Sequence, residues 1–277
     1  MFELRSLIAT RYVQPLREGG SLPAIVDTDG GGLFVTKFRG AGQGVKALIA
    51  ELVVGLLAHE TFAIPELALI TIPEAFGKSE PDPEIQDLLR ASHGVNFGMR
   101  YLDGAFNFDG SAAGELVSPE LAASIVWFDA FVTNPDRTHR NPNLLIWNRL
   151  PWLIDHGAAL YAHHDWESVD KARMRSRFPL IKDHVLLSRA GDIGKADEEL
   201  IERFTPDVIA RVVDAVPDAL LNDKTIAADF PDARAARQRY VDYLVTRLQA
   251  PRAFVAEAID AQARAARMPR TRLAARR

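Results

Sequence analysis

The sequence of 277 residues contains no cysteine, which excludes disulfide bonds, thiolate metal sites and a cysteine nucleophile. Its first residues, Met1-Phe2-Glu3-Leu4-Arg5, lack the basic and apolar regions of a signal peptide. The longest strongly apolar run, residues 47–58, is interrupted by Glu51 and is too short to cross a bilayer. We therefore expect a soluble, cytoplasmic protein with no membrane partner.

Basic residues are scarce over most of the chain. The sequence has 33 Lys and Arg against 37 Asp and Glu, but six of the arginines, and no acid, fall within residues 264–277. Residues 1–263 therefore carry 27 basic and 37 acidic side chains, a formal net charge of −10. A surface this acidic argues against nucleic acid as a partner, and we interpret the arginine-rich end as a frayed, solvated helix.

Several common site motifs are also missing. No Gly-x-x-x-x-Gly-Lys-Ser/Thr and no Gly-x-Ser-x-Gly sequence occurs, which excludes P-loop and α/β-hydrolase sites. Residues 40–44, Gly-Ala-Gly-Gln-Gly, resemble a dinucleotide-binding fingerprint, but Val45 stands where the spacing requires a third glycine. His156, His163 and His164 lack the His-Glu-x-x-His spacing of a zinc site.

The local patterns divide the chain into two parts. In the first, they predict strands over 11–17, 22–28, 33–39 and 67–72, an extended segment over 95–102, a helix over 45–59 and a surface loop over 77–84. In the second, Ser118-Pro119-Glu120 begins a helix that ends near 133, residues 144–147 and 152–154 form a short hairpin, and the chain from about 197 is helical. We predict an α+β fold with a β-rich N-terminal lobe, 1–103, and a helical C-terminal lobe, 104–277.

The densest polar cluster lies between the predicted helix and the hairpin, at residues 134–143. Asp136 is separated from Asn141 by the four residues Arg-Thr-His-Arg, and Asp155 of an Asp-His-Gly sequence comes nineteen residues after Asp136. This order is typical of phosphoryl-transfer sites of the kinase type. Asp136 can accept a proton from a substrate hydroxyl, and Asn141 and Asp155 offer the hard oxygen ligands that Mg²⁺ prefers.

The first part contains a matching pair of charges. Lys37 lies near the end of the predicted strand over 33–39, and Glu51 is the only charge in the apolar run over 47–58. Because a buried carboxylate needs a partner, we predict that Glu51 pairs with Lys37, and that Lys37 binds phosphates as its counterpart does in kinases. Asp129 is likewise a charge in an apolar helix, and we interpret it as a group that holds the 134–143 loop.

These residues resemble the HipA-like kinase family and, more distantly, the phosphoinositide kinases. The resemblance covers most of residues 10–165 and is strongest over 17–25, 34–51 and 127–160. It implies a bilobal protein-kinase-like fold, with Asp136 as catalytic base, Lys37 on the ATP phosphates and Asn141 and Asp155 as Mg²⁺ ligands. It also implies that the nucleotide contacts Gly19, Gly20 and Ser21 in the phosphate-covering turn, and Met99, Tyr101 and Leu102 near the adenine-binding hinge.

The resemblance further implies an activity. We expect an ATP- and Mg²⁺-dependent kinase that phosphorylates a hydroxyl, with Ser or Thr of a protein as acceptor and self-phosphorylation at Ser21 as an additional reaction. The alternatives are a nucleotide-binding regulatory or toxin-antitoxin-type module that acts through a partner protein, and a small-molecule kinase. A small partner protein is expected to supply the N-terminal elements that other family members carry.

Overall fold

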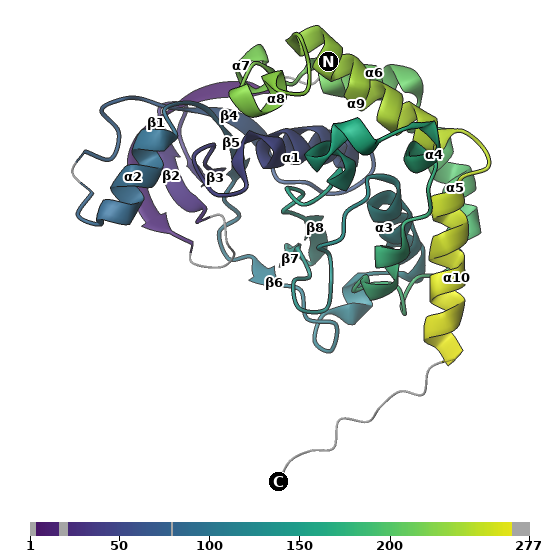
Figure 1. The fold of residues 1–277 in the computed structure, drawn as a ribbon. Helices are drawn as coiled ribbons and strands as arrows, with labels where there is room; N and C mark the ends of the chain where they lie inside the picture. The colour runs from purple at the N-terminus through teal and green to yellow at the C-terminus, as the bar shows by residue number, and fades with distance from the viewer. Residues whose placement is uncertain (1–3, 17–21, 79, 268–277) are drawn as a thin grey trace.

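The first part of the chain is a small β-barrel. The structure, a computed structural model, describes residues 4–16, 22–78 and 80–267. Five strands pair in the order β1-β2-β3-β5-β4 and close on themselves. They are β1 (Arg5–Pro15), β2 (Ala24–Thr28), β3 (Leu33–Lys37), β4 (Leu67–Ile72) and β5 (Gly94–Arg100). The barrel and the helices that follow it are seen in Figure 1, and the sequence prediction of an α+β fold is confirmed in that form.

Closure of the barrel depends on β1. This strand pairs antiparallel with β2, but its first residues, 5–8, pair in parallel with β4. The sequence predicted a strand only over 11–17, because no local pattern reveals a parallel partner sixty residues away. The barrel itself is a feature that the sequence analysis did not predict.

Two helices lie within this part of the chain. In α1 (Gly44–His59) all residues over 47–58 are buried, as expected for a helix with apolar side chains on nearly every face. The second helix, α2 (Pro83–Ala91), begins at Asp82, whose side chain accepts the N–H of Glu84 at 2.9 Å, and has Pro83 in its first turn. The predicted surface loop over 77–84 was therefore wrong beyond Asp82.

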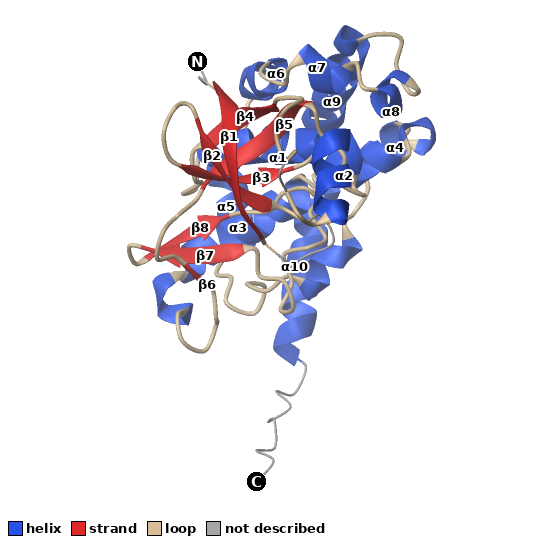
Figure 2. Ribbon diagram, turned by 90° about the vertical axis from the view of Figure 1, so that its left-hand side faces the viewer, coloured by secondary structure: helices blue, strands red, loops and turns tan. Residues whose placement is uncertain are grey.

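The second part of the chain is mainly helical. A three-stranded sheet of β6 (Phe106–Asn107), β7 (Leu144–Trp147) and β8 (Leu150–Leu153) lies beneath the barrel in Figure 2, and it contains the predicted hairpin. The α-helices are α3 (Pro119–Phe131), α4 (Lys171–Met174), α5 (Ile193–Ile201), α6 (Pro206–Asp214), α7 (Asp218–Leu221), α8 (Lys224–Ala227), α9 (Ala233–Leu248) and α10 (Ala253–Arg267). Short 3₁₀ turns are η1 (Gly114–Leu116), η2 (Tyr161–His164), η3 (Trp166–Ser168) and η4 (Pro179–Asp183).

The buried helix α3 lies at the centre of this second part. Ser118 caps it, accepting the N–H of Leu121 at 3.2 Å, as the sequence predicted. Trp127 stacks on Phe204 with ring centroids 5.7 Å apart and meets Phe254 edge-on at 5.5 Å. The same hydrophobic core includes α1 and side chains of β4 and β5. The division of the chain near residue 103 remains a prediction.

Within the described residues, we find no helix with the length and apolar character needed to cross a membrane.

Candidate active site

Lys37 lies between two carboxylates. It is the last residue of β3, and its Nζ contacts the carboxylate of Glu51 on α1 and donates to Asp155 Oδ1 at 2.5 Å. The side chains of Lys37 and Glu51 are 10% and 1% exposed, whereas that of Asp155 is 41% exposed. The contact predicted between Lys37 and Glu51 is therefore present, and Asp155 joins it at the edge open to solvent.

Glu51 also holds the backbone after Asp155. Its two carboxylate oxygens accept the N–H groups of His156 at 2.9 Å and of Gly157 at 2.8 Å. A Cβ atom on residue 157 would lie 3.0 Å from Glu51 Oε1, so glycine lets the backbone approach this closely. One buried carboxylate thus joins β3, α1 and the Asp-His-Gly segment.

Lys37 and Asp155 each stabilise the charged form of the other. Burial by itself would lower the pKa of Lys37, but the carboxylates of Glu51 and Asp155 raise it well above its usual value. Burial raises the pKa of Asp155, yet Lys37 outweighs this effect and the net shift is downward. A positively charged lysine therefore stands beside an ionised, partly exposed carboxylate, as a site for phosphate and a cation requires.

The loop over 134–143 is anchored by the buried Asp129 of α3. Arg137 Nε donates to Asp129 Oδ2 at 2.5 Å, and Asn134 Nδ2 donates to Oδ1 at 3.0 Å. Although burial raises the pKa of Asp129, Arg137 and His184 hold it well below its usual range. Leu186 N–H donates to His184 Nδ1 at 3.1 Å, so the neutral ring donates from Nε2 to Asp129 at 2.9 Å. Asp129 holds the loop, as the sequence predicted.

The carboxylate of Asp136 accepts hydrogen bonds from two asparagines. Asn141 Nδ2 donates to Asp136 Oδ2 at 2.7 Å, and Asn143 Nδ2 donates to the same oxygen at 3.2 Å. Burial raises the pKa of Asp136, as does the Asp155 carboxylate, while the hydrogen bonds from Asn143 and Asn141 lower it; the net shift is upward. A carboxylate with a raised pKa is a better proton acceptor than a fully solvated one.

Asn143 is a site residue that the sequence analysis missed. Its side chain reaches the backbone oxygen of Asp155 at 3.4 Å as well as Asp136, so it links the loop to the strand end. Asn143 and Asp155 both adopt left-handed backbone conformations, with φ of 48° and 55°. Asn and Asp tolerate this region better than most residues. A second asparagine two residues after Asn141 was the signal that could have identified it.

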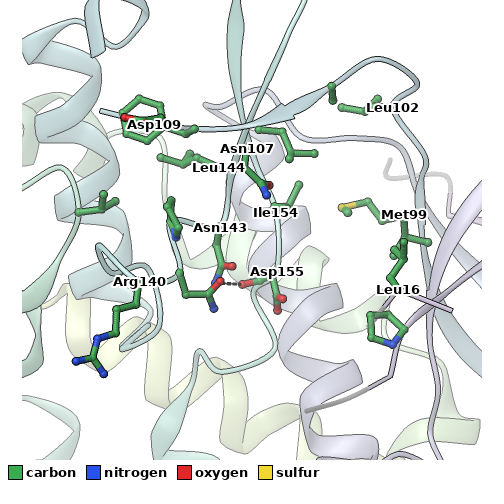
Figure 3. Close-up of a pocket in the computed structure, with 18 of the residues that line it drawn as sticks. Leu16, Met99, Leu102, Asn107, Asp109, Arg140, Asn143, Leu144, Ile154 and Asp155 are labelled. Carbon is green, nitrogen blue, oxygen red and sulfur yellow. Dashed lines mark hydrogen bonds between the residues drawn. The ribbon is translucent and has the colours of Figure 1, made fainter. Parts of the chain in front are cut away.

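These side chains open into a cavity of about 1600 Å³. Lys37, Glu51, Asn141, Asn143 and Asp155 line it, and Figure 3 shows Asn143 beside Asp155 with Leu16 and Met99 across the cavity from them. Of the predicted hinge residues, Met99, Tyr101 and Leu102 all line the cavity.

Two groups of predicted site residues are not among the described residues that line the cavity. Asp136 is not among the described residues that line it, and lies behind Asn141 and Asn143. Gly19, Gly20 and Ser21 lie outside the described residues, although Leu16 and Pro23, on either side of them, line the cavity. The phosphate-covering turn and the modification of Ser21 remain predictions.

Comparison with known proteins identifies the family. The family model for HipA-like kinase matches residues 10–177, more than half of the chain. The chain belongs to the HipA-like kinase family. The match spans β2, β3, α1 and the segment from Asp129 to Asp155, so the family sequence pattern includes every element that forms the cluster around Lys37.

Structural comparison supports the fold. A proinflammatory kinase of Helicobacter pylori, CtkA, has a TM-score of 0.50 to this structure at 11% sequence identity, covering 91% of this chain and 96% of that one. No curated protein matches the chain in sequence. Membership of a kinase family identifies the chain as a kinase and implies the use of ATP.

The donor atoms fit a magnesium ion bound together with phosphate. Asp155 and Asn141 present hard oxygen ligands at the cavity, and the amide nitrogen of Asn141 is bonded to Asp136, so its oxygen is the atom that can bind a cation. Within the described residues, no group of three or more His, Cys, Asp or Glu side chains could hold a metal ion. Mg²⁺ in phosphoryl-transfer sites commonly takes its remaining ligands from phosphate oxygens and water.

Proposed function

We propose that this chain is an ATP- and Mg²⁺-dependent kinase that transfers the γ-phosphoryl group to a Ser or Thr hydroxyl of a protein. The barrel and the helical part would form the two lobes of a protein-kinase-like fold, with the nucleotide in the cavity between Met99 and Asp155. The observation that carries the proposal is the position of Lys37, held between Glu51 and Asp155 at the wall of that cavity.

Each charged residue has a role in this proposal. Lys37 binds phosphate oxygens, and Glu51 keeps its ammonium group in place. Asp155 and Asn141 hold the cation, with Asn143 fixing the backbone of Asp155. Mg²⁺, when bound, would neutralise negative charge on the phosphate oxygens.

Asp136 is the proposed general base. Because its Oδ2 already accepts two N–H donors, we assign proton abstraction from the acceptor hydroxyl to Oδ1. The hydrogen bonds from Asn141 and Asn143 fix the carboxylate plane, and the raised pKa increases its basicity.

The size of the cavity supports a second substrate beside the nucleotide. Its volume of about 1600 Å³ exceeds the ~300–1,000 Å³ that is common for a single small-molecule site. Its walls also include Asp109, Ser188 and Arg189, and Figure 3 shows Asp109 across the cavity from Met99 and Leu102. An extended acceptor such as a polypeptide segment would occupy this remaining space.

Incubation with γ-labelled ATP, Mg²⁺ and a cell lysate tests the proposal. We expect label on protein Ser or Thr with the wild-type chain, and labelling slower by about 10²–10⁴-fold with Asp136→Asn. Label found only in small molecules would refute the protein acceptor. Absence of any label, together with no binding of Mg·ATP in calorimetry, would refute the kinase itself.

A further inference from the structure

Two ion pairs connect the start of α1 to helices near the other end of the chain. Arg39, just after β3, donates from Nη2 to Asp223 Oδ2 at 2.7 Å. Lys46, in the first turn of α1, donates to Asp229 Oδ2 at 2.9 Å. The four side chains are between 15% and 30% exposed, so both pairs are largely shielded from water. Partial burial makes such pairs stronger and less salt-sensitive than exposed ones.

The partners of the first pair are held rigidly on both sides. Asp223 caps α8: its Oδ1 accepts the N–H of Thr225 at 3.0 Å and the hydroxyl of Thr225 at 2.8 Å. This leaves Oδ2 directed at Arg39. The backbone N–H of Arg39 donates to the buried Asn96 Oδ1 at 2.8 Å. An ion pair between two groups that are already ordered loses little side-chain entropy when it forms. It can therefore hold the segments that carry the two groups in a fixed relative position.

The two pairs flank the residues that hold phosphate in the proposed function. Arg39 follows Lys37 by two positions, and Lys46 precedes Glu51 by five. The helix itself packs against α6, α7 and α8, which lie along its outer side in Figure 1. Asp223 joins α8 to the residue that follows β3, and Asp229 joins the turn after α8 to α1. A displacement of α1 that separated Glu51 from Lys37 would therefore have to break at least one of the two ion pairs.

We infer that Asp223 and Asp229 are positioning residues that hold α1 where Glu51 meets Lys37. This inference rests on the proposed function only for its effect on ATP. The C-terminal helices then fix the Lys37–Glu51 contact without a modification or a partner. In kinases that are regulated through the helix carrying the lysine-pairing glutamate, that helix moves between two positions.

The test compares Asp223→Asn/Asp229→Asn with the matched control Asp218→Asn. Asparagine at 223 keeps the helix cap and removes only the charge. Asp218 belongs to the same group of helices, but its partner at 2.6 Å is Arg237 of α9 rather than α1. Two measurements are made on each full-length variant: hydrogen exchange of the α1 amides, and the Kd for Mg·ATP by calorimetry.

We expect faster exchange in α1 and an affinity for Mg·ATP about tenfold weaker in the double variant, a change of about 1.4 kcal/mol. Asp218→Asn should match wild type in both measurements. Exchanging the charges of the second pair, Lys46→Asp with Asp229→Lys, should restore both properties relative to Asp229→Lys alone. If the Asp223→Asn/Asp229→Asn variant has the same α1 hydrogen-exchange rates and the same Kd for Mg·ATP as Asp218→Asn, the inference is overturned. If wild type fails to bind Mg·ATP, the proposed function fails, and exchange in α1 alone decides whether the ion pairs hold the helix.

Discussion

The backbone N–H of Gly157 donates to Glu51 Oε1 at 2.8 Å, so the helix that positions Lys37 also positions the segment that follows Asp155. Since α1 and this segment are more than a hundred positions apart in sequence, the bond is a tertiary contact that assembles the site. Any side chain at position 157 would enter this contact.

Replacing Gly157 with alanine should disrupt the site. The new Cβ would lie 3.0 Å from Glu51 Oε1, and we expect a loss of about 1–3 kcal/mol in the free energy of unfolding, as for other overpacked buried positions. Binding of Mg·ATP should weaken in parallel. Gly42→Ala is the control, because nothing lies within 4 Å of a Cβ there. Denaturant unfolding of both variants measures the difference, and equal stabilities would contradict the predicted crowding.

The Lys37–Glu51 pair should show strong energetic coupling. Removing either partner leaves the other charge buried, at a cost of about 3–5 kcal/mol. A double-mutant cycle with Lys37→Met and Glu51→Gln, followed by denaturant unfolding, measures the coupling free energy. The exposed pair Lys195–Glu199 is a control, whose coupling should stay below about 0.5 kcal/mol. Additive losses at Lys37 and Glu51 would show that their contact contributes nothing.

Asp136 and Asp155 should differ in their effects on ATP. Asp136→Asn should leave the Kd for Mg·ATP nearly unchanged and reduce the rate of transfer by about 10²–10⁴-fold, because a general base contacts the acceptor. Asp155→Asn should weaken Mg·ATP binding by about tenfold, or about 1.4 kcal/mol. Calorimetry with and without Mg²⁺ distinguishes the two. The metal assignment is wrong if Asp155→Asn binds Mg·ATP as tightly as wild type.

The anchor of the catalytic loop should be costly to disturb. Asp129→Asn leaves the buried guanidinium of Arg137 without its charged partner, and we expect a loss of about 3–5 kcal/mol in the free energy of unfolding. Asp192→Asn, which keeps an exposed helix cap that bonds Lys195 N–H, is a control expected to lose less than about 0.5 kcal/mol. A small loss at Asp129 would mean that the loop has other, sufficient anchors.

Buried His156 predicts a pH-dependent stability. Burial, with Arg137 nearby, lowers its pKa from 6.5 to about 3. Between these values the unfolded state binds a proton that the folded state does not, so stability falls as the pH drops below about 6.5. The contribution of one histidine is about 1.4 kcal/mol per pH unit. In His156→Gln the pH dependence of the unfolding free energy between pH 6 and 4 should be shallower by this amount, and an unchanged slope would refute the assignment.

The sequence predicted those parts of the site in which a residue departs from the pattern of its neighbours. A single charge in an apolar helix identified Glu51 and Asp129, because a buried carboxylate requires a partner. The contact of Glu51 with Lys37 and the anchoring of the loop by Asp129 are both present in the structure. The spacing of Asp136, Asn141 and Asp155 identified the loop and the strand end that approach each other.

Features that depend on distant partners were not predictable in this way. The parallel pairing of β1 with β4, and the ion pairs of Arg39 and Lys46, join segments whose local patterns are independent of each other. Asn143 was missed for another reason: it lies in a run of polar residues, and its place two residues after Asn141 is a signal that a turn residue can also give. The start of α2 carried a recognisable signal, Asp82-Pro83, that was interpreted as loop.

Closure of the barrel has a consequence for how other proteins can bind this molecule. Because β1 pairs with β2 over residues 9–15 and with β4 over residues 5–8, each strand of the described barrel has a partner on both sides, which leaves an extended peptide little backbone to join as an added strand. A protein that binds the barrel must therefore recognise its side chains, so its affinity would depend on surface charge and shape and would change with salt.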